Sequence, residues 1–275
     1  MRRSLFAAAF LACSATAPAY AAEPFHFVAF GDMPYKIPEA YAPFERLLVG
    51  IDAAKPAFSI HVGDIKSGSS PCTDAAFQKI HDYFMNMEAP LFFTPGDNEW
   101  TDCHRKKAGR FDPQERLAKL REMFFAEPKS LGKTTMDYVR QSDVSSHTQM
   151  VENALWSHEG VLFATAHIVG SNNGLERSSE SAAEHFARDA ANVEWIAGAF
   201  AKAQEDDAAA VVLAIHANPG FEVDKSWDYS NSGFKNTVAA IADGAKKFGK
   251  PALVIHGDSH RFQINRPLRA CPKSG

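Results

Sequence analysis

The chain has 275 residues, of which 45% are hydrophobic and 23% are charged, and its formal net charge is −4. This composition is ordinary for a globular protein and excludes a fibrous or low-complexity chain. A slightly acidic balance also gives no support for a nucleic-acid partner, which usually requires a basic face, so none is expected. The length suits a single α/β domain.

The first residues have the pattern of a secretory signal peptide. Arg2 and Arg3 precede an apolar run over residues 5–12, and Ala19-Tyr20-Ala21 supplies small residues for cleavage before Ala22. We expect residues 1–21 to be removed, leaving a domain over residues 22–275 that is periplasmic or secreted. The apolar run is too short for a mature membrane span, so no membrane anchor is expected. The alternative is a first helix of the folded domain.

Four cysteines are present, and Cys13 lies in the leader, where a lipoprotein signal is a further alternative. An exported chain meets oxidising conditions, in which disulfides persist. Cys72 and Cys103 each come shortly after one of the Gly-Asp motifs described below. We expect a disulfide between them that ties two loops together; two free buried thiols are the alternative. Cys271 is left over near the chain end.

The first half of the domain predicts strands that alternate with helices. Apolar runs at 25–30, 57–62 and 90–95 are typical of buried strands. They run into Gly31-Asp32, Gly63-Asp64 and Gly96-Asp97-Asn98-Glu99. Apolar residues at helical spacing predict helices at 40–54, 74–85 and 112–124, with Asp74 and Asp112 as N-caps. This alternation implies βαβ units.

The second half begins with strands, at 136–139, 154–156 and 161–169, which we assign to a second sheet. Residues 171–174 have the composition of a loop. Helices are expected at 183–203 and 234–248, and buried strands at 210–215 and 252–256. These last strands run into His216 and into Gly257-Asp258-Ser259-His260. The sequence thus predicts one α/β domain with two packed sheets flanked by helices.

The motifs all follow strands, where ligands collect in α/β sheets. If the strands are neighbours, six side chains converge: Asp32, Asp64, Asp97, His216, Asp258 and His260. Four carboxylates in one pocket repel and raise one another's pKa unless a cation compensates their charge. Because Asp and His are ligands for Mn, Fe and Zn, the sequence predicts a site for one or two such ions.

The order of these motifs resembles that of the calcineurin-like metallophosphoesterases, which include the purple acid phosphatases. The resemblance spans residues 25–262. It implies a four-layer sandwich of two mixed sheets between helices, two divalent or trivalent metal ions (Mn, Fe or Zn), and hydrolysis of a small phosphorylated substrate. It further implies that Asp32 and His260 bind the first metal and that Asp64 bridges both. The implied ligands of the second metal are His216, Asp97 and Asp258.

Five positions depart from the family pattern. Asp97 stands where the family usually has Asn, and Asp258 where it usually has His. Both exchanges keep a metal-binding side chain and add negative charge. Pro34 replaces a His of many members, and Ser67 replaces the Tyr of purple acid phosphatases. Asn98 occupies the place of the His that assists the leaving group.

Asn98 cannot act as a general acid at neutral pH. If the resemblance holds, the proton for the leaving group must come from another residue or from water. Glu99, His104 and water are the candidates. The alternative function is a catalytically degenerate protein of the same fold that binds metal or a phosphate ligand. Members of the family generally continue with further strands beyond the last motif. The short C-terminal segment here is therefore expected to be either a natural shortening of the domain or the end of an incomplete chain. The substrate, the ester class and the oligomeric state are left open.

Several residues near the motifs have both a purely structural and a functional interpretation. His61 is assigned to core packing rather than to support of the metal ligands. Lys66 and Arg105 are assigned to solvated surface charge rather than to phosphate binding. Tyr35 is a candidate for contact with metal or substrate through the first loop, and Trp100 either walls the pocket or packs below it.

Overall fold

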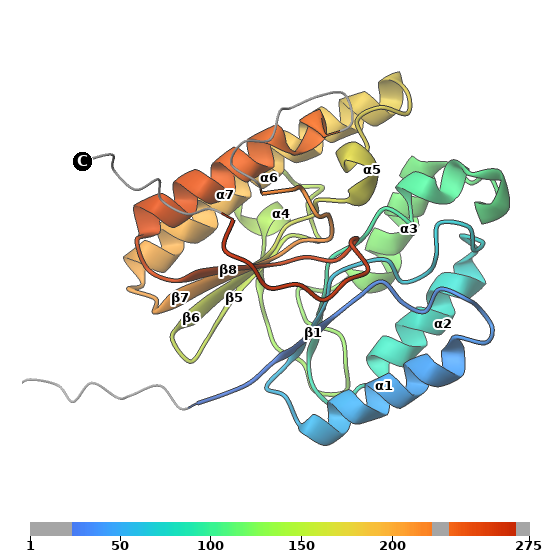
Figure 1. Ribbon diagram of the computed structural model, residues 1–275, viewed down its shortest axis with the longest axis horizontal. Coiled ribbons are helices and arrows are strands. Elements are labelled where there is room, and N and C mark those ends of the chain that lie inside the picture. The colour runs from blue at the N-terminus through green and yellow to red at the C-terminus, as the bar shows by residue number, and fades with distance from the viewer. Residues whose placement is uncertain (1–23, 222–230, 268–275) are drawn as a thin grey trace, which may run out of the picture.

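The computed structural model describes residues 24–221 and 231–267. It contains a three-stranded and a five-stranded sheet flanked by helices (Figure 1). The expected leader over residues 1–21, together with Cys13 and Cys271, lies outside the described residues. None of the helices in the described ranges is long and apolar enough to cross a bilayer.

The smaller sheet is parallel, with strands in the order β1 (Val28–Phe30), β2 (Ser59–His61) and β3 (Leu91–Phe93). Helix α1 (Tyr41–Ala54) connects β1 to β2, α2 (Asp74–Met85) connects β2 to β3, and α3 (Pro113–Phe124) follows β3. The Asp112 carboxylate accepts hydrogen bonds from the first backbone N–H groups of α3, as predicted. The prediction of Asp74 as the cap of α2 is wrong, because the Thr73 hydroxyl accepts that bond.

The larger sheet is mixed, in the order β4 (Val139–Arg140), β5 (Ala154–His158), β6 (Val161–Thr165), β7 (Ala210–Ala214) and β8 (Ala252–Ile255). Strands β4 to β6 are antiparallel neighbours, and β6 to β8 are parallel. Helices α6 (Ser179–Glu205) and α7 (Lys235–Phe248) run side by side over this sheet (Figure 1).

The shorter elements lie in the connections. They are α4 (Gln141–Val144), α5 (Gly170–Asn173) and the 3-10 turns η1 (Thr101–His104), η2 (Lys106–Ala108) and η3 (Ser232–Phe234). The loop predicted at 171–174 is therefore a short helical turn, in which Ser171 and Asn172 have left-handed backbone conformations.

Three apolar clusters separate the layers. Between the sheets, Phe58 and Phe92 of the smaller sheet pack against Trp156 and Phe163 of the larger one. Phe92 stacks on Trp156 with ring centroids 3.6 Å apart. A second cluster joins the smaller sheet to α1, α2 and α3, and a third joins the larger sheet to α6 and α7. Helices, two sheets and helices thus form successive layers, and both sheets are covered on both faces.

The parallel strands end along one line between the two sheets. The Asp32 N–H donates to the Gly63 carbonyl at 3.0 Å, and the Gly257 N–H donates to the His216 carbonyl at 2.8 Å. Across the sheets, His216 Nδ1 lies 2.7 Å from the Val62 carbonyl oxygen. The loops that leave β1, β2, β3, β7 and β8 therefore meet at one place, as the sequence predicted.

A buried ion pair fixes the start of β5 against α3. Glu152 is fully buried, and its carboxylate accepts hydrogen bonds from the Arg121 guanidinium at 2.7 and 3.0 Å. His167 Nδ1 lies 2.7 Å from the same carboxylate. Burial raises the pKa of Glu152, but the Arg121 charge and the His167 hydrogen bond outweigh it and hold the pKa well below its ordinary value.

We expect Glu152→Gln to lower the free energy of unfolding near neutral pH by about 3 kcal/mol, because a buried charge loses its partner. The pKa of Glu152 is lower in the folded than in the unfolded chain. Its stabilisation is therefore present above the unfolded value near 4.3 and is lost as the pH falls below it. Urea unfolding from neutral to acidic pH measures both effects. The exposed Glu122→Gln is the control, and an equal loss in both variants would contradict the assignment.

Candidate metal centre

Four residues at the centre have unusual backbone conformations. Asp32, Asp64, Asp258 and His260 have positive φ angles of 57°, 59°, 66° and 51°. Such conformations are uncommon outside glycine, and they occur mainly where a surrounding structure enforces them. A Cβ on Gly63, whose φ is +91°, would lie 2.7 Å from His216 Nδ1. The glycine in this motif is thus required for the close approach of the two sheets.

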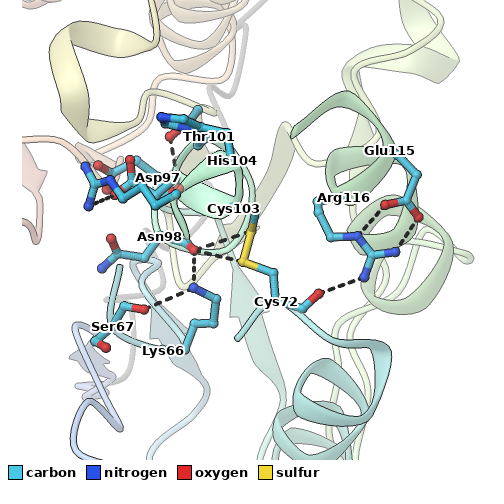
Figure 2. The surroundings of a disulfide bond; sticks show 12 residues. Lys66, Ser67, Cys72, Asp97, Asn98, Thr101, Cys103, His104, Glu115 and Arg116 are labelled. Atoms are coloured by element: carbon cyan, nitrogen blue, oxygen red, sulfur yellow. Dashed lines mark hydrogen bonds and ion pairs between the residues drawn. A yellow bond between two sulfur atoms is a disulfide. The ribbon is translucent and has the colours of Figure 1, made fainter. Parts of the chain in front are cut away.

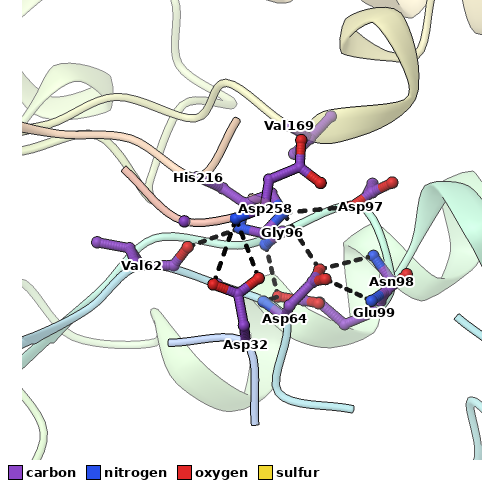
Figure 3. Close-up of polar contacts among 12 residues, drawn as sticks. Asp32, Val62, Asp64, Gly96, Asp97, Asn98, Glu99, Val169, His216 and Asp258 are labelled. Carbon is purple, nitrogen blue, oxygen red and sulfur yellow. Dashed lines mark hydrogen bonds and ion pairs between the residues drawn. The ribbon is translucent and has the colours of Figure 1, made fainter. Parts of the chain in front are cut away.

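Asp64, Asp97 and His216 form one group of donor atoms, and all three side chains are buried (Figure 3). His216 Nε2 lies 3.3 Å from Asp64 Oδ1 and 3.2 Å from Asp97 Oδ1. The Val62 carbonyl can only accept, so the proton of the neutral ring sits on Nδ1. This tautomer leaves the Nε2 lone pair facing the two carboxylates, as a metal ligand requires.

Asp32, Asp64 and His260 form a second group, which shares Asp64 with the first. His260 Nε2 lies 3.5 Å from Asp32 Oδ1. The Tyr35 hydroxyl sits among these atoms, donating to Asp64 Oδ2 at 2.6 Å and lying 3.1 Å from His260 Nε2. Tyr35 therefore reaches the side chains of the second group through the first loop, and its contact with metal or substrate stays a prediction.

The donor atoms suit metal ions. Each group offers two carboxylates and one imidazole, with donor atoms within 4.8 Å of one another. Ligands bonded at about 2.0–2.2 Å to one ion stand roughly 3.0–3.5 Å apart, and the separations between His216 or His260 and their carboxylates fall in this range. Nitrogen and oxygen donors without thiolate favour Mn, Fe or Zn. The residues thus fit one ion per group, with Asp64 able to contact both.

Burial and neighbouring charges shift the pKa values of the buried side chains at the centre. Burial raises the pKa of Asp64, and the nearby Glu99 and Asp97 charges add to this shift. Burial lowers the pKa of His216, but the Asp64 charge and the Asp97 hydrogen bond raise it well above its ordinary value. Burial opposes ionisation of Asp97, yet its bonds to His216 and Ser171 lower its pKa to about 2. A cation would relieve this crowding of carboxylates.

Asp258 contributes its backbone to the centre, and its predicted role as a metal ligand stays a prediction. Neither group includes it. Its backbone N–H donates to both Asp32 oxygens, at 3.0 and 3.2 Å, and so holds that carboxylate in place. Its own carboxyl lies close enough to Asp97 and Asp32 for their charges to raise its pKa, although burial is the larger cause.

The two candidate acids, Glu99 and His104, belong to neither donor group. Glu99 is fully buried, and its Oε1 accepts hydrogen bonds from the backbone N–H groups of Asp64 and Gly96. It thereby fixes the loops that carry Asp64 and Asp97. His104 Nδ1 is 2.7 Å from the Thr101 carbonyl, at the exposed end of η1. The role of Glu99 or His104 as the acid for the leaving group stays a prediction.

Asn98 links the centre to a disulfide (Figure 2). Its side-chain amide donates to Asp64 Oδ2, and its backbone N–H donates to Asp64 Oδ1 at 3.1 Å. Its carbonyl oxygen accepts from the Lys66 ammonium and lies 3.7 Å from each sulfur of the Cys72–Cys103 pair. The two sulfur atoms are at bonding distance, which agrees with the predicted disulfide.

Sequence reasoning was wrong about the exposure of one side chain near the centre and did not predict the contact of another. Lys66 was assigned to the surface, but its side chain is buried, and burial lowers its pKa to about 8. Ser171 donates to Asp97 Oδ2 at 2.7 Å and had no sequence signal beyond a polar loop. His61 packs between Phe84 and Phe93, as expected of a core residue.

An open cleft adjoins the group formed by Asp32, Asp64 and His260. Its lining includes Tyr35, Asn98, His260, the segment 67–69 and the cationic segment 105–107. Trp100 is buried away from it, with the Arg188 guanidinium over its ring. Comparison of the sequence with known protein families and with curated proteins finds no match.

We expect the double variant Cys72→Ala/Cys103→Ala to lose about 3–4 kcal/mol of unfolding free energy, because the disulfide closes a loop with a sequence separation of 31 residues. Denaturant unfolding of the oxidised and reduced protein measures this. Reductant should destabilise the wild type to the same extent and leave the double variant unchanged. A loss in the double variant without any effect of reductant on the wild type would contradict the assignment.

We expect Mn²⁺ or Zn²⁺ to bind and to raise the melting temperature, and Asp64→Asn to abolish most of the effect because Asp64 serves both groups. Isothermal calorimetry gives the stoichiometry. His260→Ala should remove binding at one group and keep it at the group of His216. Asp189→Asn, a buried aspartate outside both groups, is the control. Unchanged binding in Asp64→Asn would exclude this centre.

Proposed function

We propose that this protein is a metal-dependent phosphoesterase of the calcineurin-like type. The observation that carries the proposal is the sharing of Asp64 between two groups of metal-binding side chains, at the line where parallel strands of both sheets end. The order of the motifs along the chain supports the same assignment. The adjoining cleft supports it too, because it is open to solvent and its lining includes Tyr35, Asn98 and His260, which belong to or contact the metal-binding groups.

The residues of the chain have separable tasks in this proposal. Asp32, Asp64 and His260 hold one ion, and Asp64, Asp97 and His216 hold the other. Val62, Ser171 and Asn98 keep His216, Asp97 and Asp64 in the orientation that binding requires. Ions held in this way lower the pKa of water to about 7 and neutralise charge on a phosphate ester.

Hydrolysis then requires two proton movements. The oxygen of water forms the new bond to phosphorus as the ester P–O bond breaks, and the attacking water loses a proton to solvent. The leaving oxygen gains a proton. Asn98 cannot supply it, and buried Glu99 faces the backbone of Gly96 and Asp64. Of the remaining candidates, His104 and water, we assign the proton of the leaving group to solvent in the open cleft, because His104 is not among the residues that line it.

The test is turnover of p-nitrophenyl phosphate and bis-p-nitrophenyl phosphate by chelator-treated protein, with Mn, Fe, Zn, Mg or no metal restored. We expect metal to restore hydrolysis, and Asp64→Asn to lower kcat/KM by at least about a hundredfold, because a ligand to both ions is lost. Asp189→Asn is again the control. Metal binding without turnover of either ester would instead support a catalytically degenerate binding protein of the same fold.

A further inference from the structure

The cleft beside the centre has two electrostatically different ends. At one end Tyr35, Asn98 and His260 belong to or contact the metal-binding groups. At the other end Arg105, Lys106 and Lys107 are consecutive cations in the lining, and all three are exposed. Because negative charge crowds one end and positive charge the other, the cleft is polarised along its length.

Arg105, the first of these cations, is held in place beside Asn98. Its Nη1 donates to the buried carboxylate of Asp102 at 2.6 Å. A Cβ placed on Gly68 would lie 2.6 Å from both Arg105 Nη1 and Asn98 Oδ1. The guanidinium therefore lies beside the side-chain amide that also contacts Asp64. The absence of a side chain at Gly68 leaves room for this approach.

Lys106 and Lys107 extend the positive charge away from the centre. They form the 3-10 turn η2, which follows the disulfide-anchored turn η1. Within the described residues neither lysine forms an ion pair. Their ammonium groups are thus available to a ligand, while the turn that carries them is fixed through Cys103 to the loop of Cys72.

We infer that the substrate carries a second anionic group, a phosphate or a carboxylate, which Arg105, Lys106 and Lys107 bind while the scissile phosphate lies at the metal-binding groups. This inference rests on the proposed function. A simple monoester places its only charge at the metal end and leaves the ammonium groups of Lys106 and Lys107 without a partner. A substrate with charge at both ends matches the polarity of the whole cleft.

The test compares methylumbelliferyl phosphate with analogues whose methyl group is replaced by a phosphonomethyl or a carboxymethyl group. The leaving oxygen is the same in all three, so a difference reports the remote charge. We expect kcat/KM to be about tenfold higher for the charged analogues at low salt, and this advantage to shrink at high ionic strength. The two analogues distinguish a phosphate site from a carboxylate site.

Lys106→Gln/Lys107→Gln should abolish the advantage of the charged analogues and leave kcat/KM for methylumbelliferyl phosphate within about twofold of the wild type, because neither lysine contacts a metal ligand. Lys246→Gln/Lys247→Gln removes an equally exposed lysine pair at the end of α7 and should retain the advantage. An advantage that persists in Lys106→Gln/Lys107→Gln, or that is absent from the wild type, would overturn the inference while leaving the phosphoesterase proposal intact.

A binding measurement separates this inference from the proposed function. Calorimetry with an α,ω-alkane bisphosphonate and with the alkane monophosphonate of equal length requires no turnover. We expect the metal-loaded wild type to bind the bisphosphonate about tenfold more tightly, and Lys106→Gln/Lys107→Gln to bind both alike. Equal affinities in the wild type would count against the second anion site. If the protein binds the bisphosphonate more tightly but hydrolyses no ester, the result would contradict the proposed hydrolysis and leave the second anion site supported.

Discussion

The structure depends on the meeting of the two sheets at Asp64 and His216. Asp64 follows a strand of the smaller sheet, and His216 follows a strand of the larger one. Their side chains are 3.3 Å apart, and His216 also reaches the Val62 carbonyl. Packing of Phe92 on Trp156 and of their neighbours brings these strand ends together. The apolar core between the sheets thus sets the geometry of the polar centre.

The centre brings several carboxylates together, and their burial and mutual repulsion disfavour the folded state. Buried Asp64 and Asp97, with Asp32 and Glu99 beside them, carry more negative charge than His216 can balance. Glu99 is held by backbone N–H groups, and Asn98 and Ser171 donate to the ligand carboxylates. Hydrogen bonds of this kind make the crowding tolerable, and a bound cation would complete the compensation.

A second layer of structure fixes the loops themselves. The Cys72–Cys103 disulfide lies against the Asn98 carbonyl, and the buried Lys66 ammonium donates to the same oxygen. The turn of Cys103 continues into the cations at 105–107 that line the cleft. One anchored segment therefore supports Asn98 beside the metal-binding groups and positions the positive end of the cleft.

The order of the strands and long helices and the convergence of the acidic and His motifs could be predicted from the sequence. Strand bounds were less accurate: the strand predicted at 136–139 is Val139–Arg140, and the one predicted at 161–169 ends at Thr165. Apolar runs and Gly-Asp turns are local signals, and parallel strands bring their ends to one edge. Five of the six expected ligands meet in two groups. The tertiary structure was needed to show that the Asp258 backbone N–H holds the Asp32 carboxylate, that Lys66 is buried, and that Ser171 reaches Asp97. These outcomes depend on loop conformation and on contacts between distant segments, which residue type and spacing do not encode.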